Sequence, residues 1–487
     1  MFSRKENSLN QSANYSQIQL SKLSEKLIET TEFQRLKDSK NSTVAVTDTL
    51  KEFSITRYDH SIHSAKQAHL LENANLTDYQ KHCLELALLL HDIAHTRASH
   101  SVDRIYAQLK DSPKIQEYGY SSQDYHEYHT VKTVASEKFR ELFSNDELHQ
   151  DIIAILSYDD KRSEEEKRKD YQENREVCKK SLSDKEVEIL YTLKDWLDRA
   201  SYIELEFQAS NFTKEIKQNC IEELKEFRSS LEIYDDKVVV RQENELIHNS
   251  PAMKLMKLRN FLFDETVHHP LNALIDEYLI RNVQADDYKT FHEVVHIAPA
   301  LAFSKEAYSL ISQKREKSIE HEVYPILTID SYFLSEAGII AFSEYRDTQY
   351  KNLTREICNK TSSASTAELL INLRLREIDP DSEIYVLQAK RQRKDFSFNA
   401  ISDNNKITHV DKSINTDPYY RVIVATTNNN VIVREELKRE VEDEFINRRW
   451  ILESSSFYPT LVKIPINFEH IFNKNIFTDK ANIVKYE

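Results

Sequence analysis

LELALLLHDIAHTRASHSVD, residues 84–103, is the stretch that decides the fold of this chain. Its first seven residues include only one charge, Glu85, which is typical of a helix buried on most sides. Three histidines and two aspartates follow at once, namely His91, Asp92, His95, His100 and Asp103. Such groups are costly at the end of a buried helix unless they have partners, and a divalent metal surrounded by phosphate would supply them. The alternative is a His–Asp pair that only caps a core helix.

The composition indicates a soluble, intracellular protein with room for two to four domains. Of the 487 residues, 40% are hydrophobic, and the net charge of -15 argues against general nucleic-acid binding. The four cysteines are scattered and form no CxxC pair, which suits a reducing cytosol. The first residues contain no apolar signal core, and no apolar run is long enough to span a membrane. We therefore expect a cytoplasmic protein without a membrane partner.

Glycine is almost absent from this sequence. It occurs twice in 487 residues, whereas ordinary usage is about 7%. Turns must then use Asn, Asp and Ser, which tolerate left-handed backbone best after glycine. A P-loop and a Rossmann fingerprint are both excluded, because each needs several glycines. A phosphate site in this chain must be built from side chains and metal.

The spacing of apolar residues predicts a mostly α-helical fold over residues 1–360 and a smaller α+β unit over residues 361–487. Helical spacing covers residues 17–40, 56–71, 84–90, 124–143, 187–207 and 254–283, the last interrupted at His268-His269-Pro270. After Asp379, β-branched and aromatic residues predict strands, with a hairpin connection at Asn428–Asn430 and a helix over residues 434–446. We expect the second unit to serve oligomerisation or regulation.

The candidate metal ligands are spread over three predicted helices. His60 precedes the His91-Asp92 pair, and a later aspartate on the helix over residues 187–207 completes a set of four. Asp198 and Asp195 both qualify as that aspartate because they lie one turn apart. Mixed His and Asp ligands suit a divalent ion such as Fe, Mn, Zn or Ni, with Mg as a further candidate, and the metal can clamp phosphate oxygens during hydrolysis.

The motifs occur in the order of a known family. They are Phe33-Gln34-Arg35-Leu36, Arg57-Tyr58-Asp59-His60-Ser61, His91-Asp92-Ile93-Ala94-His95 with Ser99-His100 and Asp103, His126-Glu127, Asp198-Arg199 with Tyr202, and Arg259-Asn260. Together they resemble the HD-domain metal phosphohydrolases, and more narrowly the dGTPase-like deoxynucleoside triphosphate triphosphohydrolases. The resemblance implies an HD-domain fold and hydrolysis of a (deoxy)nucleoside triphosphate to nucleoside and triphosphate, in a homo-oligomer.

The resemblance also implies roles for individual residues. The metal ligands would be His60, His91, Asp92 and Asp198. The triphosphate would contact Arg57, Arg199, Tyr202 and Arg259, and an additional Mg would accompany the nucleotide. His100, oriented by Asp103, would protonate the leaving oxygen, with His95 and His126 beside the α-phosphate. Glu206 falls where the family binds the sugar 3′-hydroxyl, and Asn41 stands in the pair that reads the sugar.

This sequence departs from the family at several positions. Ala94 and Thr96 replace glycines after the HD pair, and a phosphate-binding lysine falls on Pro270. Asn41-Ser42 replaces the family's Gln-Leu pair, so we expect weaker exclusion of ribonucleotides. Two alternatives remain open: an HD phosphohydrolase acting on a nucleoside monophosphate or an alarmone, and a nucleotide-sensing scaffold without turnover.

Overall fold

The computed structural model describes residues 15–39, 55–95, 125–159, 180–210, 212–242 and 250–265 of the helical part, and 328–334, 373–380, 383–389, 396–402, 407–412, 419–426, 430–447 and 451–457 beyond it. The principal helices are α1 (Lys22–Ile28), α2 (Thr31–Gln34), α3 (Arg57–Gln67), α4 (Asp78–Leu90), α7 (Tyr125–Val134), α8 (Glu137–Arg140), α9 (Asp146–Leu156), α11 (Asp184–Ala209), α12 (Lys214–Ser230), α13 (Pro251–Glu265) and α19 (Val431–Asn447). Short 3-10 turns are η2 (Tyr15–Gln17), η3 (Arg35–Asp38) and η4 (Ala68–Leu70).

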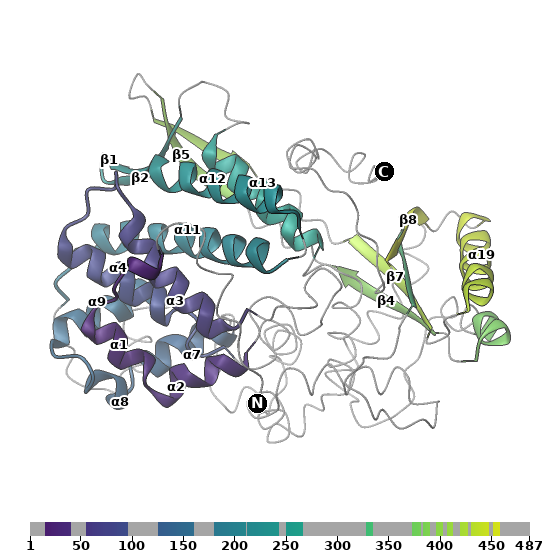
Figure 1. Ribbon diagram of the computed structural model, residues 1–487, viewed down its shortest axis with the longest axis horizontal. Coiled ribbons are helices and arrows are strands. Elements are labelled where there is room, and N and C mark those ends of the chain that lie inside the picture. The colour runs from purple at the N-terminus through teal and green to yellow at the C-terminus, as the bar shows by residue number, and fades with distance from the viewer. Residues whose placement is uncertain are drawn as a thin grey trace.

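Two four-stranded sheets complete the described fold (Figure 1). The first has the order β1-β2-β5-β6, built from β1 (Leu231–Tyr234), β2 (Lys237–Arg241), β5 (Phe396–Ile401) and β6 (Ile407–Lys412). The second has the order β4-β7-β3-β8, built from β4 (Glu383–Ala389), β7 (Tyr419–Thr426), β3 (Thr328–Leu334) and β8 (Ile451–Phe457). The expectation of a mostly helical chain with a smaller α+β region toward the C-terminus is therefore confirmed.

The helix α4 lies at the centre of the hydrophobic core, and α3 and α11 pack against it (Figure 1). All eight residues from Cys83 to Leu90 are buried. The one charge among them, Glu85, accepts hydrogen bonds from the Ser21 backbone amide at 2.9 Å, from the Ser24 hydroxyl and from His69 Nε2 at 2.7 Å. This carboxylate therefore fastens the start of α1 to the core helix.

The three helices that meet in the core begin with the same local signal. Thr56 caps α3, Thr77 caps α4 and Ser183 caps α11, each as the first residue of a complete capping box. In a capping box the hydroxyl and the third-residue side chain satisfy backbone amides that have no partner inside the helix. The starts of these helices are thus determined locally.

Aspartates form the tight turn of the β1–β2 hairpin. Asp235 and Asp236 both have left-handed backbone, with φ of 49° and 54°. Two-residue hairpin turns with positive φ at both positions usually contain glycine. Their use of aspartate agrees with the expectation drawn from a chain with two glycines.

The region after β7 differs from the expectation. The predicted hairpin at residues 428–430 is wrong, because helix α19 begins at Val431 rather than a strand. The Asn430 side chain accepts a hydrogen bond from the Ile432 amide at 3.0 Å, so asparagine starts a helix here instead of a β-turn. The neighbours of β7 are β3 and β4.

Strand pairing links the two expected units. β5 and β6 come from residues beyond 361, yet β5 pairs in parallel with β2, with Val240 opposite Ala400. The division at residue 361 stays a prediction. No helix in the described ranges is both long and apolar enough to cross a membrane, and the cytoplasmic location stays a prediction as well.

Candidate metal centre

Three helices bring the predicted ligands to one place. His60 lies in the first turn of α3, His91 is the C-terminal cap of α4 and is followed by Asp92, and Asp198 lies within α11. The side chains of His60, His91 and Asp92 are at most 8% exposed, and that of Asp198 is 26% exposed. Residues far apart in sequence thus share one partly enclosed site.

The interatomic distances suit a single ion held by these groups. The Oδ1 atom of Asp198 lies 2.8 Å from His60 Nε2 and 3.1 Å from His91 Nε2. Asp92 Oδ2 lies 3.7 Å from the same nitrogen of His60 and 3.5 Å from that of His91. One donor atom from each of His60, His91 and Asp198 falls within 4.8 Å of the others.

The orientation of His91 fits a metal ligand. Its Nδ1 lies 2.7 Å from the Leu88 carbonyl oxygen, so Nδ1 carries the proton and Nε2 presents a lone pair. Nε2 is buried and makes no hydrogen bond. A buried imidazole nitrogen facing a carboxylate and a second imidazole is the donor set that a divalent transition metal prefers.

The charges at the site stabilise its carboxylates in ionised form. Burial alone would raise the pKa of Asp92, but Arg57, His91 and His95 outweigh burial and hold it well below its usual range. Burial also acts to raise the pKa of Asp198, and His91 and His60 hold it well below its usual range in the same way. Both carboxylates are therefore available as anionic ligands near neutral pH.

A second donor group lies on the other side of Asp92. Asp92 Oδ1 is 3.2 Å from His95 Nε2, and the His95 and His126 rings stack with centroids 4.0 Å apart. These three residues also have donor atoms within 4.8 Å of one another. Arg57 Nη1 lies 2.5 Å from Asp92 Oδ2, the oxygen that faces His60 and His91 rather than His95. Three of the four ligands predicted from the sequence form the group of His60, His91 and Asp198, so we take this group as the candidate metal site.

The predicted triphosphate contacts lie on α11 and α13. Arg199 and Tyr202 follow Asp198 on α11, and Arg259 is buried on α13. Arg199 Nη2 binds Asp195 Oδ2 at 2.6 Å, so Asp195 pairs with an arginine while Asp198 faces the histidines. Burial raises the pKa of Tyr202 to about 12 against the opposing effect of Arg259 and Arg199, so its hydroxyl stays neutral.

The remaining predicted residues divide into two groups. Glu206 is buried on α11, two helical turns beyond Asp198. His100, Asp103 and Asn41 lie outside the described residues. The metal, catalytic and substrate roles assigned from the sequence stay predictions.

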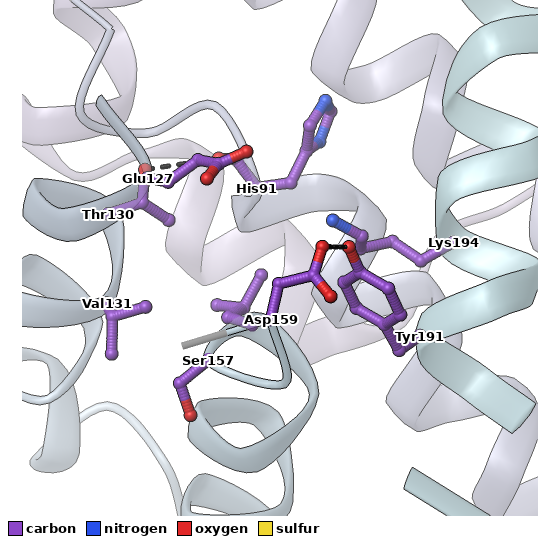
Figure 2. A pocket seen from close by; sticks show the side chains of 9 residues that line it. His91, Glu127, Thr130, Val131, Ser157, Asp159, Tyr191 and Lys194 are labelled. Atoms are coloured by element: carbon purple, nitrogen blue, oxygen red, sulfur yellow. Dashed lines mark hydrogen bonds between the residues drawn. The ribbon is translucent and has the colours of Figure 1, made fainter. Parts of the chain in front are cut away.

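A small pocket lies beside His91, and Lys194 lines it (Figure 2). Its lining residues are His91, Glu127, Thr130, Val131, Leu156, Ser157, Asp159, Tyr191 and Lys194. Figure 2 shows the Lys194 amine close to the hydrogen-bonded pair of Tyr191 and Asp159. No sequence motif singles out Lys194, although it lies four residues before Asp198 and therefore on the same helix face.

Comparison with known proteins gives one family match and similar solved structures. A family model described as HD domain matches residues 57–193, which include His60, His91 and Asp92 and end five residues before Asp198. No curated protein matches the chain. A phosphohydrolase from Bacteroides thetaiotaomicron, known from a crystal structure, is similar at 13% sequence identity with a TM-score of 0.47, covering 84% of this chain and 97% of its own.

The matched family and the buried donor group point the same way. The HD domain, together with His/Asp clusters that can hold a metal, supports a metal-dependent phosphohydrolase. We conclude that the chain contains an HD domain over residues 57–193.

Proposed function

We propose that this protein is a metal-dependent hydrolase that cleaves nucleoside triphosphates into nucleoside and triphosphate. The observation that carries the proposal is the group of His60, His91 and Asp198, whose donor atoms lie within 4.8 Å of one another, beside a buried Arg57. One divalent ion held there, with Asp92 as a fourth ligand, would clamp phosphate oxygens and neutralise their charge.

Cations around this group support a substrate with several phosphates. Arg57 on α3, Arg199 on α11 and Arg259 on α13 provide three guanidinium groups from three helices. Guanidinium groups suit phosphates because their planar forks donate two parallel hydrogen bonds. Three guanidinium groups carry more positive charge than is needed to bind a single phosphate group. The neutral Tyr202 hydroxyl adds a further donor.

The leaving group in this proposal is a nucleoside 5′-oxygen, which gains from a positioned acid. We assign this role to His100, with Asp103 holding its far nitrogen. General acid catalysis is typically worth about 10²–10⁴ in rate. The variant His100→Ala is therefore expected to retain metal and nucleotide while losing turnover by that factor, and Asp103→Asn is expected to lose less. Normal turnover by His100→Ala would assign the proton to another group.

Recognition of the sugar is the part where a departure from the family's pattern is expected. Asn41-Ser42 replaces a pair that excludes ribonucleotides in the family that the sequence resembles, and Glu206 replaces an aspartate for the 3′-hydroxyl. We therefore expect this protein to cleave both deoxyribonucleotides and ribonucleotides. A strict preference for deoxyribonucleotides would contradict this part of the proposal and leave the reaction itself unaffected.

Product analysis separates the proposal from its alternatives. The metal-loaded protein is incubated with a panel of dNTPs, NTPs and nucleoside monophosphates, and triphosphate and orthophosphate are quantified separately. Triphosphate release supports the proposal, whereas orthophosphate from monophosphates alone replaces it with the phosphomonoesterase alternative. Nucleotide binding without any product indicates a scaffold. The isosteric variant Asp92→Asn is the control, since activity that persists in it comes from another enzyme in the preparation.

A further inference from the structure

A chain of buried polar side chains runs behind His60 and joins α12, α3 and α11, which pack together (Figure 1). We call it the His60 relay, and it consists of Arg228, Gln67, His63, Ser201 and His60. Arg228, Gln67, Ser201 and His60 are at most 3% exposed. The simplest interpretation of these residues is that they are buried polar groups that only satisfy one another's hydrogen bonds. The donor and acceptor at each hydrogen bond indicate that these residues also act on the ring of His60.

The relay begins at a group whose role is unambiguous. Arg228 Nη1 lies 2.9 Å from Glu204 Oε2 and 3.1 Å from Gln67 Oε1. Arginine can only donate, so Gln67 Oε1 is the acceptor and Gln67 Nε2 is the donor. That amide nitrogen reaches the Tyr15 hydroxyl at 2.9 Å and His63 Nδ1 at 3.3 Å. His63 Nδ1 must therefore be an acceptor.

The direction continues from His63 to the ligand. Ser201 Oγ lies 2.9 Å from His63 Nδ1, so the serine gives its only proton to that nitrogen. The Ser64 hydroxyl gives its proton to Ser201 Oγ at 2.8 Å and lies 3.5 Å from each ring nitrogen of His60. Ser201 Oγ can then only accept from its remaining neighbour, His60 Nδ1, at 3.4 Å. His60 must carry a proton on Nδ1 for this contact to be a hydrogen bond.

The consequence concerns the nitrogen on the other side of the ring. His60 Nε2 lies 2.8 Å from Asp198 Oδ1, a carboxylate that would draw the proton of a neutral imidazole to Nε2. A proton there would block the lone pair that a metal needs. An acceptor at Nδ1 opposes that tautomer, because ligand histidines depend on the hydrogen bond made by their second nitrogen.

We propose that Ser201 is a positioning residue that keeps the proton of His60 on Nδ1 and so leaves Nε2 open to the metal. The proposal rests on the metal centre of the proposed function. Its specific content is that the tautomer of a ligand on α3 is set by an arginine on α12 through Gln67, His63 and Ser201. Ser201 touches no substrate in this proposal and acts only through His60.

Metal titration of two serine variants tests the proposal. Ser201→Ala removes the acceptor and is expected to weaken Zn²⁺ or Mn²⁺ binding by about 10–100-fold, the usual effect of losing a hydrogen-bond partner of a ligand. Ser61→Ala is the matched control, because the Ser61 hydroxyl is also buried on α3 beside His60 but has no hydrogen-bond partner among the described residues. Its affinity is expected to stay within about threefold of wild type. Equal affinities for all three proteins, or equal losses in both variants, would overturn the relay.

A spectroscopic measurement separates this inference from the metal centre itself. The ¹⁵N spectrum of the histidine side chains is recorded for the wild type with and without Zn²⁺, with His60→Gln used to assign the ring. A proton on His60 Nδ1 is expected in both states, and its absence overturns the relay. A wild type that binds no metal while His60 keeps that proton refutes the metal centre but not the relay. Urea denaturation of each variant confirms that the fold is intact.

Discussion

The buried ion pair of Arg228 and Glu204 provides a quantitative test of the packing behind the metal centre. The two side chains are 3% and 0% exposed, with Arg228 Nη1 2.9 Å from Glu204 Oε2. The Tyr15 hydroxyl donates to the same oxygen at 2.8 Å. In the variant Arg228→Met the apolar stem stays and the charge is lost, so Glu204 is left buried without its cation. Removing one partner of a buried pair typically costs about 3–5 kcal/mol of unfolding free energy.

The difference in unfolding free energy between wild type and Arg228→Met is also expected to depend on pH. In the wild type, burial alone would raise the pKa of Glu204, but the charge of Arg228 and the hydrogen bond from Tyr15 hold it below its usual value. A lowered folded-state pKa contributes stability above the unfolded pKa of about 4.3, and that stability is lost as the pH falls. In Arg228→Met, burial dominates and the folded-state pKa of Glu204 rises, so this carboxyl destabilises the fold as the pH increases. The gap between the two proteins should therefore widen from pH 5 toward neutrality.

Urea denaturation at several pH values between 5 and 8 measures this gap. Arg241→Met is the control, because Arg241 pairs with Glu232 at the surface, where such pairs are worth about 0–1 kcal/mol. The double variant Arg228→Met/Glu204→Leu is expected to recover most of the loss, since an apolar pair replaces an ionic one. The reasoning is refuted if Arg228→Met costs less than about 1 kcal/mol, or if the gap does not change with pH.

Three further predictions concern the same helices. Asp198→Asn should lose its stoichiometric metal while Asp195→Asn keeps it, as measured by elemental analysis, and the reverse result would exchange the two residues. Burial lowers the pKa of His63 to about 4; because the unfolded value is about 6.5, stability should fall by about 2–3 kcal/mol as the pH drops between these values. His63→Gln should flatten that part of the profile, and an unchanged profile would show that another group titrates. Thr56→Ala should cost about 1 kcal/mol by thermal unfolding through loss of the α3 cap, and no loss would mean that the cap is dispensable.

Much of the helical part could be predicted from local sequence. The apolar run that ends in His91-Asp92 forms the buried helix α4, and the predicted helix over residues 187–207 lies within α11. Periodicity and capping boxes are local signals, so they survive folding into almost any tertiary context. The resemblance in motif order likewise led to the HD domain, and two of its histidines, His60 and His91, lie at the start of α3 and the end of α4.

The choice between Asp195 and Asp198 needed the tertiary structure. Both lie on α11, one turn apart, and helical periodicity allows either to face the core. The packing of α11 on α3 and α4 turns Asp198 toward His60 and leaves Asp195 paired with Arg199. Small rotations of a helix change which of two such residues meets a neighbour, and no local pattern encodes that rotation.

Contacts between residues far apart in the sequence determined the buried polar contacts and the order of the strands. The contact of Arg228 with Gln67 spans 161 residues, and that of Ser201 with His60 spans 141, so neither the relay nor its direction is visible in the sequence. β2 acquires β5 as its parallel neighbour across a stretch of chain of similar length. At Asn430 the sequence allowed a turn or a helix cap, and the structure selected the cap. Sequence patterns determine elements because their hydrogen bonds are local, whereas the partners of buried polar groups are determined only when those elements pack.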